Sequence, residues 1–331
     1  MTAPADIPVP QDTPAPAGAR AAPVRPVILD CDPGIDDAFA IVFGCGHPGI
    51  DLRGLSTVAG NVSLDLATAN ALSVCEFIGH PELPVAAGCP LPLLRPFDGA
   101  RGVHGDSGLG RAELPAPRGR PSGVHAVDYL IESISAAPGE ITLVATGPLT
   151  NVALALRRHP PLASQVADFI IMGGSAGRGN VTPAAEFNIF CDPEAAAVVF
   201  GAGWQVTMAG LDVTRQARAT PEVCERLARL GPLGTRLLLP GLEGYGSEAV
   251  GGQPVHDVCA LALVAAPELF LCEPARVEVE TAGRWTSGMT VTDFAAPAGQ
   301  QNALVAMSVD APAFWDLVLS AYEEAAGGVH T

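Results

Sequence analysis

Short apolar runs alternate with segments of helical periodicity along most of the chain. Runs of strand length predict strands over 27–29, 51–61, 141–146, 169–172 and 205–209. Between them, the spacing of apolar residues predicts helices over 38–43, 65–78, 126–135, 150–158 and 192–199. Repeated strand–turn–helix units of this kind predict an α/β fold with a mostly parallel central sheet and helices on both of its faces.

The last third of the chain shows the same two patterns in a different order. Helical patterns cover 220–240, 258–265 and 311–325. Apolar stretches at 276–280, 289–292 and 303–309 predict strands of a smaller closing sheet. No linker-like segment divides residues 27–331, so we expect a single domain. The Pro/Ala-rich residues 1–26 lack the continuous apolar stretch of a secretory signal and predict a disordered tail.

Composition and charge exclude several classes of function. The chain has 331 residues, 48% of them hydrophobic, without an apolar run of about 18 that would predict a membrane span. Acidic residues outnumber basic ones by 35 to 18, and the net charge of −17 disfavours nucleic acids and anionic membranes as partners. All 18 basic residues are Arg, which excludes a Schiff-base lysine and the phosphate-binding lysine of a P-loop. We expect a cytoplasmic protein.

The most acidic turn follows the first predicted strand. Asp30, Asp32, Asp36 and Asp37 lie within eight residues, around a Pro-Gly break between strand and helix. Helix capping could account for Asp36 and Asp37, with the other two carboxylates solvated. Four carboxylates this close are costly without a positive charge, and oxygen ligands suit a hard cation, so we expect Ca²⁺ or Mg²⁺ here. The carboxyl ends of strands are also where open α/β sheets bind ligands.

Other polar residues follow later strands or begin later helices. Asn61 ends the second predicted strand, although turn chemistry alone could explain it. Glu186 and Asn188 would point to the same side of an extended segment, where a carboxylate and an amide suit sugar hydroxyls. His256 begins an apolar helix together with an acid, which favours a functional site. His104 lies in a glycine-rich segment that could be a mobile lid or an ordinary surface loop.

Five short motifs resemble those of the inosine-uridine preferring nucleoside hydrolases and occur in the order found in that family. They are Asp30–Asp37, Thr57–Asn61, Ala145–Asn151, Glu186–Asn188 with Asp192–Glu194, and His256–Asp257. The resemblance covers about residues 27–325. It implies a Rossmann-like domain that hydrolyses the N-glycosidic bond of purine or pyrimidine ribonucleosides, with one Ca²⁺ per active site. It also implies a homodimer or a homotetramer.

The resemblance implies a role for each matching residue. Asp32 would be a metal ligand and also the general base for the attacking water. The further metal ligands would be Asp37, Asp257 and the backbone carbonyl of Thr146. The residues expected to bind the ribose are Asp36, Asn61, Asn180, Glu186 and Asn188. His256 would help the base to leave, and His104 would close over it.

The residue types suit this reaction. Cleavage builds positive charge on the ribosyl ring, and an acid-rich pocket would stabilise that charge. A bound Ca²⁺ would hold the 2′ and 3′ hydroxyls and lower the pKa of the water from which a carboxylate takes a proton.

Two other functions stay open on the sequence alone. Asp30 and Asp32 after an apolar strand resemble the acid pair of the haloacid-dehalogenase-like phosphatases, which use Mg²⁺ but usually supply a Lys that this chain lacks. A non-catalytic nucleoside- or ribose-binding protein could keep the same site, although no member of the chemical set is missing. The preferred base is also open, because the segments after His104 and before His256 match no motif.

Overall fold

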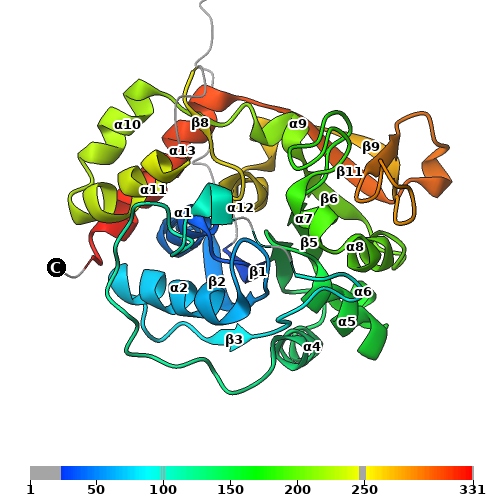
Figure 1. The fold of residues 1–331 in the computed structure, drawn as a ribbon, viewed down its shortest axis with the longest axis horizontal. Helices are drawn as coiled ribbons and strands as arrows, with labels where there is room; N and C mark the ends of the chain where they lie inside the picture. Colours follow the sequence, from blue (N-terminus) through cyan, green and yellow to red (C-terminus); the bar gives the residue numbers. More distant parts are fainter. Residues whose placement is uncertain (1–23, 98, 100, 246–250, 330–331) are drawn as a thin grey trace, which may run out of the picture.

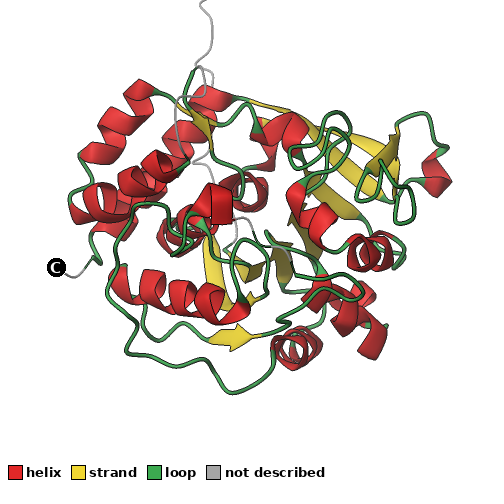
Figure 2. Ribbon diagram, viewed as in Figure 1, coloured by secondary structure: helices red, strands yellow, loops and turns green. Residues whose placement is uncertain are grey.

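The computed structural model describes residues 24–97, 99, 101–245 and 251–329. Within these residues, a nine-stranded sheet runs through the molecule with helices on both faces (Figures 1 and 2). In order across the sheet, the strands are β10 (Thr290–Asp293), β9 (Phe270–Val279), β11 (Ala303–Val309), β6 (Val206–Ala209), β5 (Asp168–Met172), β4 (Thr142–Ala145), β1 (Arg25–Cys31), β2 (Ile50–Thr57) and β3 (Val85–Ala87). Neighbouring strands from β11 to β3 are parallel. The predicted α/β fold is confirmed.

The order of the strands decides where a ligand can bind. The chain runs outward from β1 through β2 to β3, then returns to the other side of β1 and continues through β4, β5 and β6. A doubly wound sheet leaves a crevice at such a reversal, outside the carboxyl ends of its strands. The acidic turn follows β1 directly, and therefore lies at this crevice.

Alternate residues of the strands face two separate hydrophobic cores, as β1 illustrates: Val27 and Leu29 face one core, whereas Ile28 faces the other. The helices of the first core include α1 (Ile35–Gly46), α2 (Leu64–Phe77), α10 (Pro221–Ala228), α11 (Leu239–Gly244), α12 (Val258–Ala265) and α13 (Ala311–Ala326). The helices of the second core include α4 (Ala126–Ala136), α5 (Thr150–Arg158), α6 (Leu162–Gln165) and α8 (Pro193–Phe200). Figure 1 shows these two groups on opposite sides of the sheet.

The prediction of a separate closing sheet near the C-terminus is wrong. β11 pairs in parallel with β6, and β9 pairs antiparallel with β11 and β10, so these strands extend the central sheet. Buried Asn302 supports the junction, because its amide nitrogen donates to the carbonyls of Phe200 and Val277 at 3.0 Å. Its side-chain oxygen accepts the Val277 N–H at 2.8 Å. Apolar patterning identifies a strand but does not specify its pairing partner, which explains the error.

Three segments also differ from prediction in their local structure. The predicted helix over 220–240 is divided into α10, a π-helical turn over Leu233–Leu238, and α11. Gly231, with φ of +59°, and the following Pro232 interrupt it. The expected extended segment at Glu186–Asn188 instead begins the short helix α7 (Phe187–Cys191). Residues 84–125, for which the apolar pattern predicted no helix or strand, contain β3 and the short helix α3 (Arg101–His104).

The N-terminal tail predicted over 1–26 lies mostly outside the described residues, and β1 begins at Arg25. None of the helices in the described part of the chain is long and apolar enough to cross a membrane.

Candidate active site

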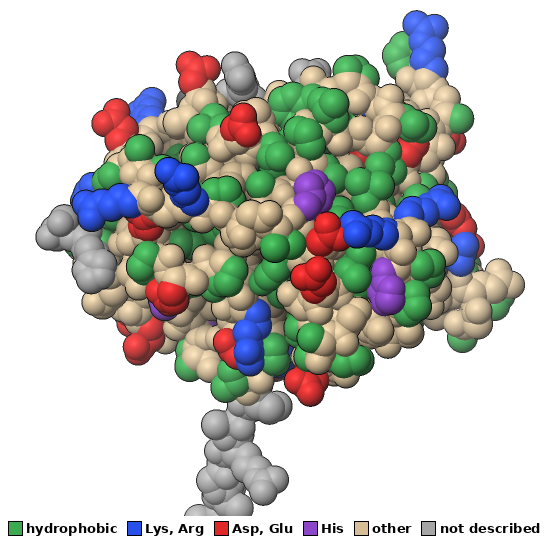
Figure 3. Space-filling view, turned by 90° about the horizontal axis from the view of Figure 1, so that it is seen from below, with side chains coloured by type: hydrophobic (Ala, Val, Ile, Leu, Met, Phe, Trp, Pro, Cys, Tyr) green, Lys and Arg blue, Asp and Glu red, His purple; other side chains and the backbone are tan. Residues whose placement is uncertain are grey.

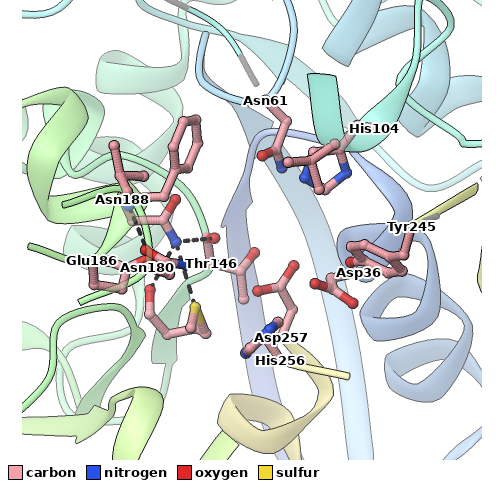
Figure 4. A pocket seen from close by; sticks show the side chains of 14 residues that line it. Asp36, Asn61, His104, Thr146, Asn180, Glu186, Asn188, Tyr245, His256 and Asp257 are labelled. Carbon is pink, nitrogen blue, oxygen red and sulfur yellow. Dashed lines mark hydrogen bonds between the residues drawn. The ribbon is translucent and has the colours of Figure 1, made fainter. Parts of the chain in front are cut away.

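A pocket lies at the carboxyl ends of the central strands, at the reversal of strand order (Figure 4). Sequence-predicted residues in its wall are Asp36, Asn61, His104, Thr146, Asn180, Glu186, Asn188, His256 and Asp257. The other two predicted residues lie directly behind this wall. Asp32 accepts a hydrogen bond from Asn61, and Asp37 accepts one from Thr146. The fold therefore brings all the predicted site residues together.

Asp32 has one fixed oxygen and one free oxygen. Its side chain is fully buried, and Oδ2 accepts the Asn61 N–H at 2.6 Å. Oδ1 is also buried but has no hydrogen-bond partner. Two glycines leave room for this carboxylate: a Cβ atom would lie 2.0 Å from Oδ2 at Gly60 and 2.7 Å from Oδ1 at Gly147. The backbone thus approaches Asp32 closely on two sides and holds it in one orientation.

Asp37 is hydrogen-bonded through both oxygens. Oδ1 accepts from the Thr146 hydroxyl at 2.9 Å and from the Asp32 N–H at 3.3 Å. Oδ2 accepts from the Gly34 N–H at 3.0 Å and from the Asn61 amide at 3.2 Å. Asp37 therefore ties together the turns after β1, β2 and β4.

Burial dominates the electrostatics of these acids. It raises the pKa of Asp36 to about 7, against a smaller opposing effect from the nearby Tyr245 hydroxyl. Burial also raises the pKa of Asp32 and of Asp257 well above the usual range for a carboxyl, and the charge of Asp37 acts in the same direction. Asp36 Oδ1 is a second buried carboxyl oxygen without a partner. Unpartnered carboxylates in one buried site require protons or a cation.

The donor set fits a hard cation. Buried carboxylate oxygens without partners, together with a backbone carbonyl, are the ligands that Ca²⁺ and Mg²⁺ take in proteins. In the described part of the chain, no three His, Cys, Asp or Glu side chains are grouped closely enough to hold an ion by themselves. A site here would consequently depend on the Thr146 carbonyl, which accepts a hydrogen bond from the Asn188 amide at 2.7 Å. The residues that could hold the ion are Asp32, Asp37, Asp257 and Thr146.

Glu186 and Asn188 face the pocket because of a helix cap rather than an extended segment. Glu186 caps α7 by accepting the N–H groups of Asn188 at 2.9 Å and Ile189 at 3.1 Å. It also accepts the Gly174 N–H at 2.9 Å. The Asn188 amide donates to the carbonyls of Thr146 and Met172. This network fixes both side chains beside β4 and β5.

Two histidines also line the pocket. His104 is buried at the end of α3, and its Nδ1 accepts the Ile35 N–H at 3.2 Å. Its ring meets that of Tyr245 edge-on, with 5.8 Å between the centroids. His256 lies just before α12, and its Nδ1 is 2.8 Å from the hydroxyl oxygen of Thr214. Burial lowers the pKa of His104 and of His256 to about 4.

Part of the wall was not predicted from sequence. Its additional members are Val103, Met172, Val181, Phe187 and Tyr245. Phe187 could have been noticed, since it lies between two predicted site residues. Tyr245 lies at the end of α11 in a segment without a motif, and no local signal identifies it.

Comparison with known proteins agrees with this geometry. A family model described as inosine-uridine preferring nucleoside hydrolase matches residues 27–316. The chain belongs to this nucleoside hydrolase family. It is 44% identical over 306 residues to the inosine-uridine preferring nucleoside hydrolase of Leishmania major, covering 90% of this chain and 98% of that protein. It is also 44% identical over 300 residues to the pyrimidine-specific ribonucleoside hydrolase RihA of Citrobacter koseri, covering 88% and 96%.

The hydrolase also resembles solved structures. The purine-preferring ribonucleoside hydrolase from Gardnerella vaginalis aligns with a TM-score of 0.86 and 32% identity, over 91% of this chain and 99% of that one. The protein is therefore an enzyme that hydrolyses N-glycosyl bonds of nucleosides, and the phosphatase alternative has no support. The names of these relatives refer to different bases, so the comparisons leave the base preference of this hydrolase open.

Proposed function

We propose that this hydrolase cleaves ribonucleosides to ribose and free base, with one Ca²⁺ per active site and Asp32 as the general base. The observation that carries the proposal is the unpartnered, buried Oδ1 of Asp32, next to an oxygen that Asn61 already fixes. A carboxylate held in this way can accept a proton from water without first breaking a hydrogen bond of its own.

Asp32, Asp37, Asp257 and the carbonyl of Thr146 would hold the ion. When bound, Ca²⁺ supplies a positive charge that offsets the buried carboxylates, holds the ribose diol and lowers the pKa of the attacking water. Ca²⁺ suits the site better than Mg²⁺, because several carboxylates, a carbonyl and two sugar hydroxyls form a larger coordination shell than Mg²⁺ prefers. The ribose itself would be bound by Asp36, Asn61, Asn180, Glu186 and Asn188.

The reaction then needs two proton movements. As the water oxygen bonds to C1′, one of its protons passes to Asp32, and the electron pair of the breaking C1′–N bond passes to the base. His256 supplies a proton to the departing base, while His104 and Tyr245 lie where they can cover it. The acidic wall stabilises the positive charge that develops on the ribosyl ring. Ribose and the base, with the new proton on its nitrogen, are the products. The proton on Asp32 later returns to solvent, and His256 takes up a proton from solvent, which restores the enzyme.

The Asp32→Asn variant tests the assignment of the base. The amide oxygen can still accept the Asn61 N–H, but an amide does not take up a proton, so kcat should fall by about 10³-fold or more at saturating Ca²⁺. Ribose release from inosine measures this loss. Asp310→Asn, which changes an exposed cap of α13 in the same way, serves as the control and should keep wild-type activity. Full turnover by Asp32→Asn would refute the assignment.

A panel of inosine, adenosine, guanosine, uridine and cytidine, assayed with and without chelator, tests metal dependence and ranks the bases. We expect ribose release that chelator abolishes and that Ca²⁺ restores better than Mg²⁺. Release that chelator does not affect would refute the metal assignment. Failure to release ribose from every nucleoside, with Ca²⁺ present, would instead support a protein that binds nucleosides without turnover.

A further inference from the structure

A buried threonine lies behind His256 and outside the wall of the pocket. Thr214 is the last residue of α9 (Leu211–Thr214), which follows β6 almost directly, and its side chain is fully buried. Its hydroxyl oxygen is 2.8 Å from Nδ1 of His256. Thr214 does not line the pocket, and its side chain is linked to the pocket wall through His256.

A small ladder of backbone pairs fixes the register between these two residues. β7 (Arg218–Ala219) runs antiparallel to β8 (Gln253–Pro254), with Arg218 opposite Pro254. The Val255 N–H continues the ladder by donating to the Ala217 carbonyl at 2.9 Å. The chain that leaves Thr214 is therefore paired with the chain that leads into His256.

The backbone of His256 is also fixed on its other side. Its carbonyl accepts the Cys259 N–H at 3.1 Å, within the first turn of α12. With the backbone held by the ladder and by the helix, the remaining freedom of His256 is rotation of its side chain. The hydrogen bond to Thr214 restricts this rotation.

We propose that Thr214 is a positioning residue that holds His256 with Nε2 directed at the nucleobase. An imidazole has two nitrogens, and Thr214 occupies Nδ1, which leaves Nε2 for the pocket. A hydroxyl can donate or accept, so it can satisfy Nδ1 with or without a proton. The proton that His256 gives up then leaves from Nε2 to the ring nitrogen of the base as the C1′–N bond breaks, and Nδ1 keeps its partner. This inference rests on the proposed role of His256.

The Thr214→Val variant removes the hydrogen bond and keeps the shape of the side chain. Two substrates separate positioning from general damage: inosine, whose base needs a proton to leave, and p-nitrophenyl β-D-ribofuranoside, whose phenolate leaves without one. We expect kcat/KM for inosine to fall roughly 10- to 100-fold, part of the 10²- to 10⁴-fold that a general acid contributes. For the nitrophenyl riboside, kcat/KM should stay within about 2-fold, because that step bypasses the acid.

Two further variants are matched controls. Thr214→Ser retains the hydroxyl and should restore most of the activity on inosine. Thr68→Val removes another buried hydroxyl, which is hydrogen-bonded to Thr57 at 2.7 Å outside the pocket wall, and should alter neither substrate. An equal loss on both substrates in Thr214→Val would reduce Thr214 to a structural role and overturn the inference. Unchanged activity on inosine would overturn it as well.

A spectroscopic readout separates this inference from the proposed function. In ¹⁵N-labelled protein, the Nδ1 and Nε2 shifts of His256, identified by their loss in His256→Asn, should change in Thr214→Val. Shifts that do not change would overturn the positioning role. The wild-type protein could also release ribose from neither substrate while the His256 shifts still change in Thr214→Val. That result would support the positioning role and refute the proposed hydrolysis.

Discussion

At the scale of single residues, the site is a group of acids that the fold has removed from water. Burial raises the pKa of each of six carboxyl groups in or behind the pocket wall: Asp30, Asp32, Asp36, Asp37, Glu186 and Asp257. For Asp30 and Asp36 the pKa rises to about 7. A protein with such acids is stabilised when they are protonated or when a cation binds.

The raised pKa values of the carboxyl groups make the folded protein less stable as the pH rises. A carboxyl whose pKa is raised by folding contributes stability that is complete below its unfolded pKa, near 4, and is lost as the pH rises through its folded pKa. The lowered pKa values of His104 and His256 act with the opposite sign, but only below about pH 6.5. Between pH 6.5 and 8, the change in the free energy of unfolding therefore comes from the carboxyl groups.

We therefore predict that, in chelator, the melting temperature falls by at least about 3 °C between pH 6.5 and pH 8. Excess Ca²⁺ should raise it at pH 8 and remove most of this difference, because the bound ion keeps the carboxylates charged at both values. Thermal unfolding followed by circular dichroism measures both effects. A melting temperature in chelator that is the same at pH 6.5 and pH 8 would contradict the raised pKa values.

Sequence analysis identified the members of the site that occur in contiguous motifs. The turn from Asp30 to Asp37 could be predicted because apolar strand, Pro-Gly break and acidic helix start all lie within a short stretch. Thr214 and Tyr245 could not be predicted in this way. Thr214 contacts His256 and Tyr245 contacts His104, and in each pair the two residues are distant in the sequence and become neighbours only in the fold.

At the scale of elements, the segment that leads to His104 is anchored at one end by a forked ion pair. Arg95 donates to the Glu194 carboxylate through Nε at 3.0 Å and Nη2 at 2.9 Å, and Nη2 also donates to the Thr281 carbonyl. The Leu93 N–H donates to Asp192 at 2.8 Å. These contacts tie the segment to the start of α8 and to the turn between β9 and β10.

We predict that Arg95→Gln raises KM for nucleosides about 3- to 10-fold and leaves kcat within about 2-fold. The reason is that the variant loosens the segment carrying His104 without touching the reacting atoms. Steady-state ribose release separates the two constants. Arg226→Gln, which breaks a more exposed ion pair with Asp316 on the surface, should change neither. A loss confined to kcat in Arg95→Gln would contradict the interpretation.

Most elements could be predicted, because a buried strand or an amphipathic helix is encoded in its own residues. The strands of the central sheet other than β3, and the helices α4 and α5, illustrate this. The pairing of β11 with β6 depends instead on partners distant in the chain. The segment around Glu186 is helical because the Glu186 carboxylate caps α7. That carboxylate also accepts the N–H of Gly174, which belongs to another turn, so the local sequence does not reveal the cap.

At the scale of the whole molecule, charge and exposed apolar surface bear on association. On the face in Figure 3, acidic and basic side chains are interspersed rather than gathered into a basic patch. With the net charge of −17, this disfavours nucleic acids as partners. Leu94 and Trp285 are large apolar side chains with 79% and 77% of their surface exposed, but single exposed residues of this kind are normal on a monomer and do not by themselves mark an interface.

We predict a homodimer or a homotetramer. Multi-angle light scattering on the eluting peak should give two or four times the chain mass of 33.8 kDa at micromolar concentration. Dilution over a hundredfold tests whether the assembly is stable. A mass of one chain throughout would contradict the prediction.

The reversal of strand order between β1 and β4 also has a consequence for folding. The site draws on turns after β1, β2, β4 and β5 and on the start of α12, so its residues extend from Asp32 to Asp257 along the chain. Parallel strands pair through long crossovers, and contacts of this kind form slowly. An intermediate containing only β1 to β3 would have Asp32 and Asn61 but lack Thr146 and Asp257. During refolding, recovery of activity should therefore follow the slowest phase in which the sheet is completed, well after most helical signal has returned.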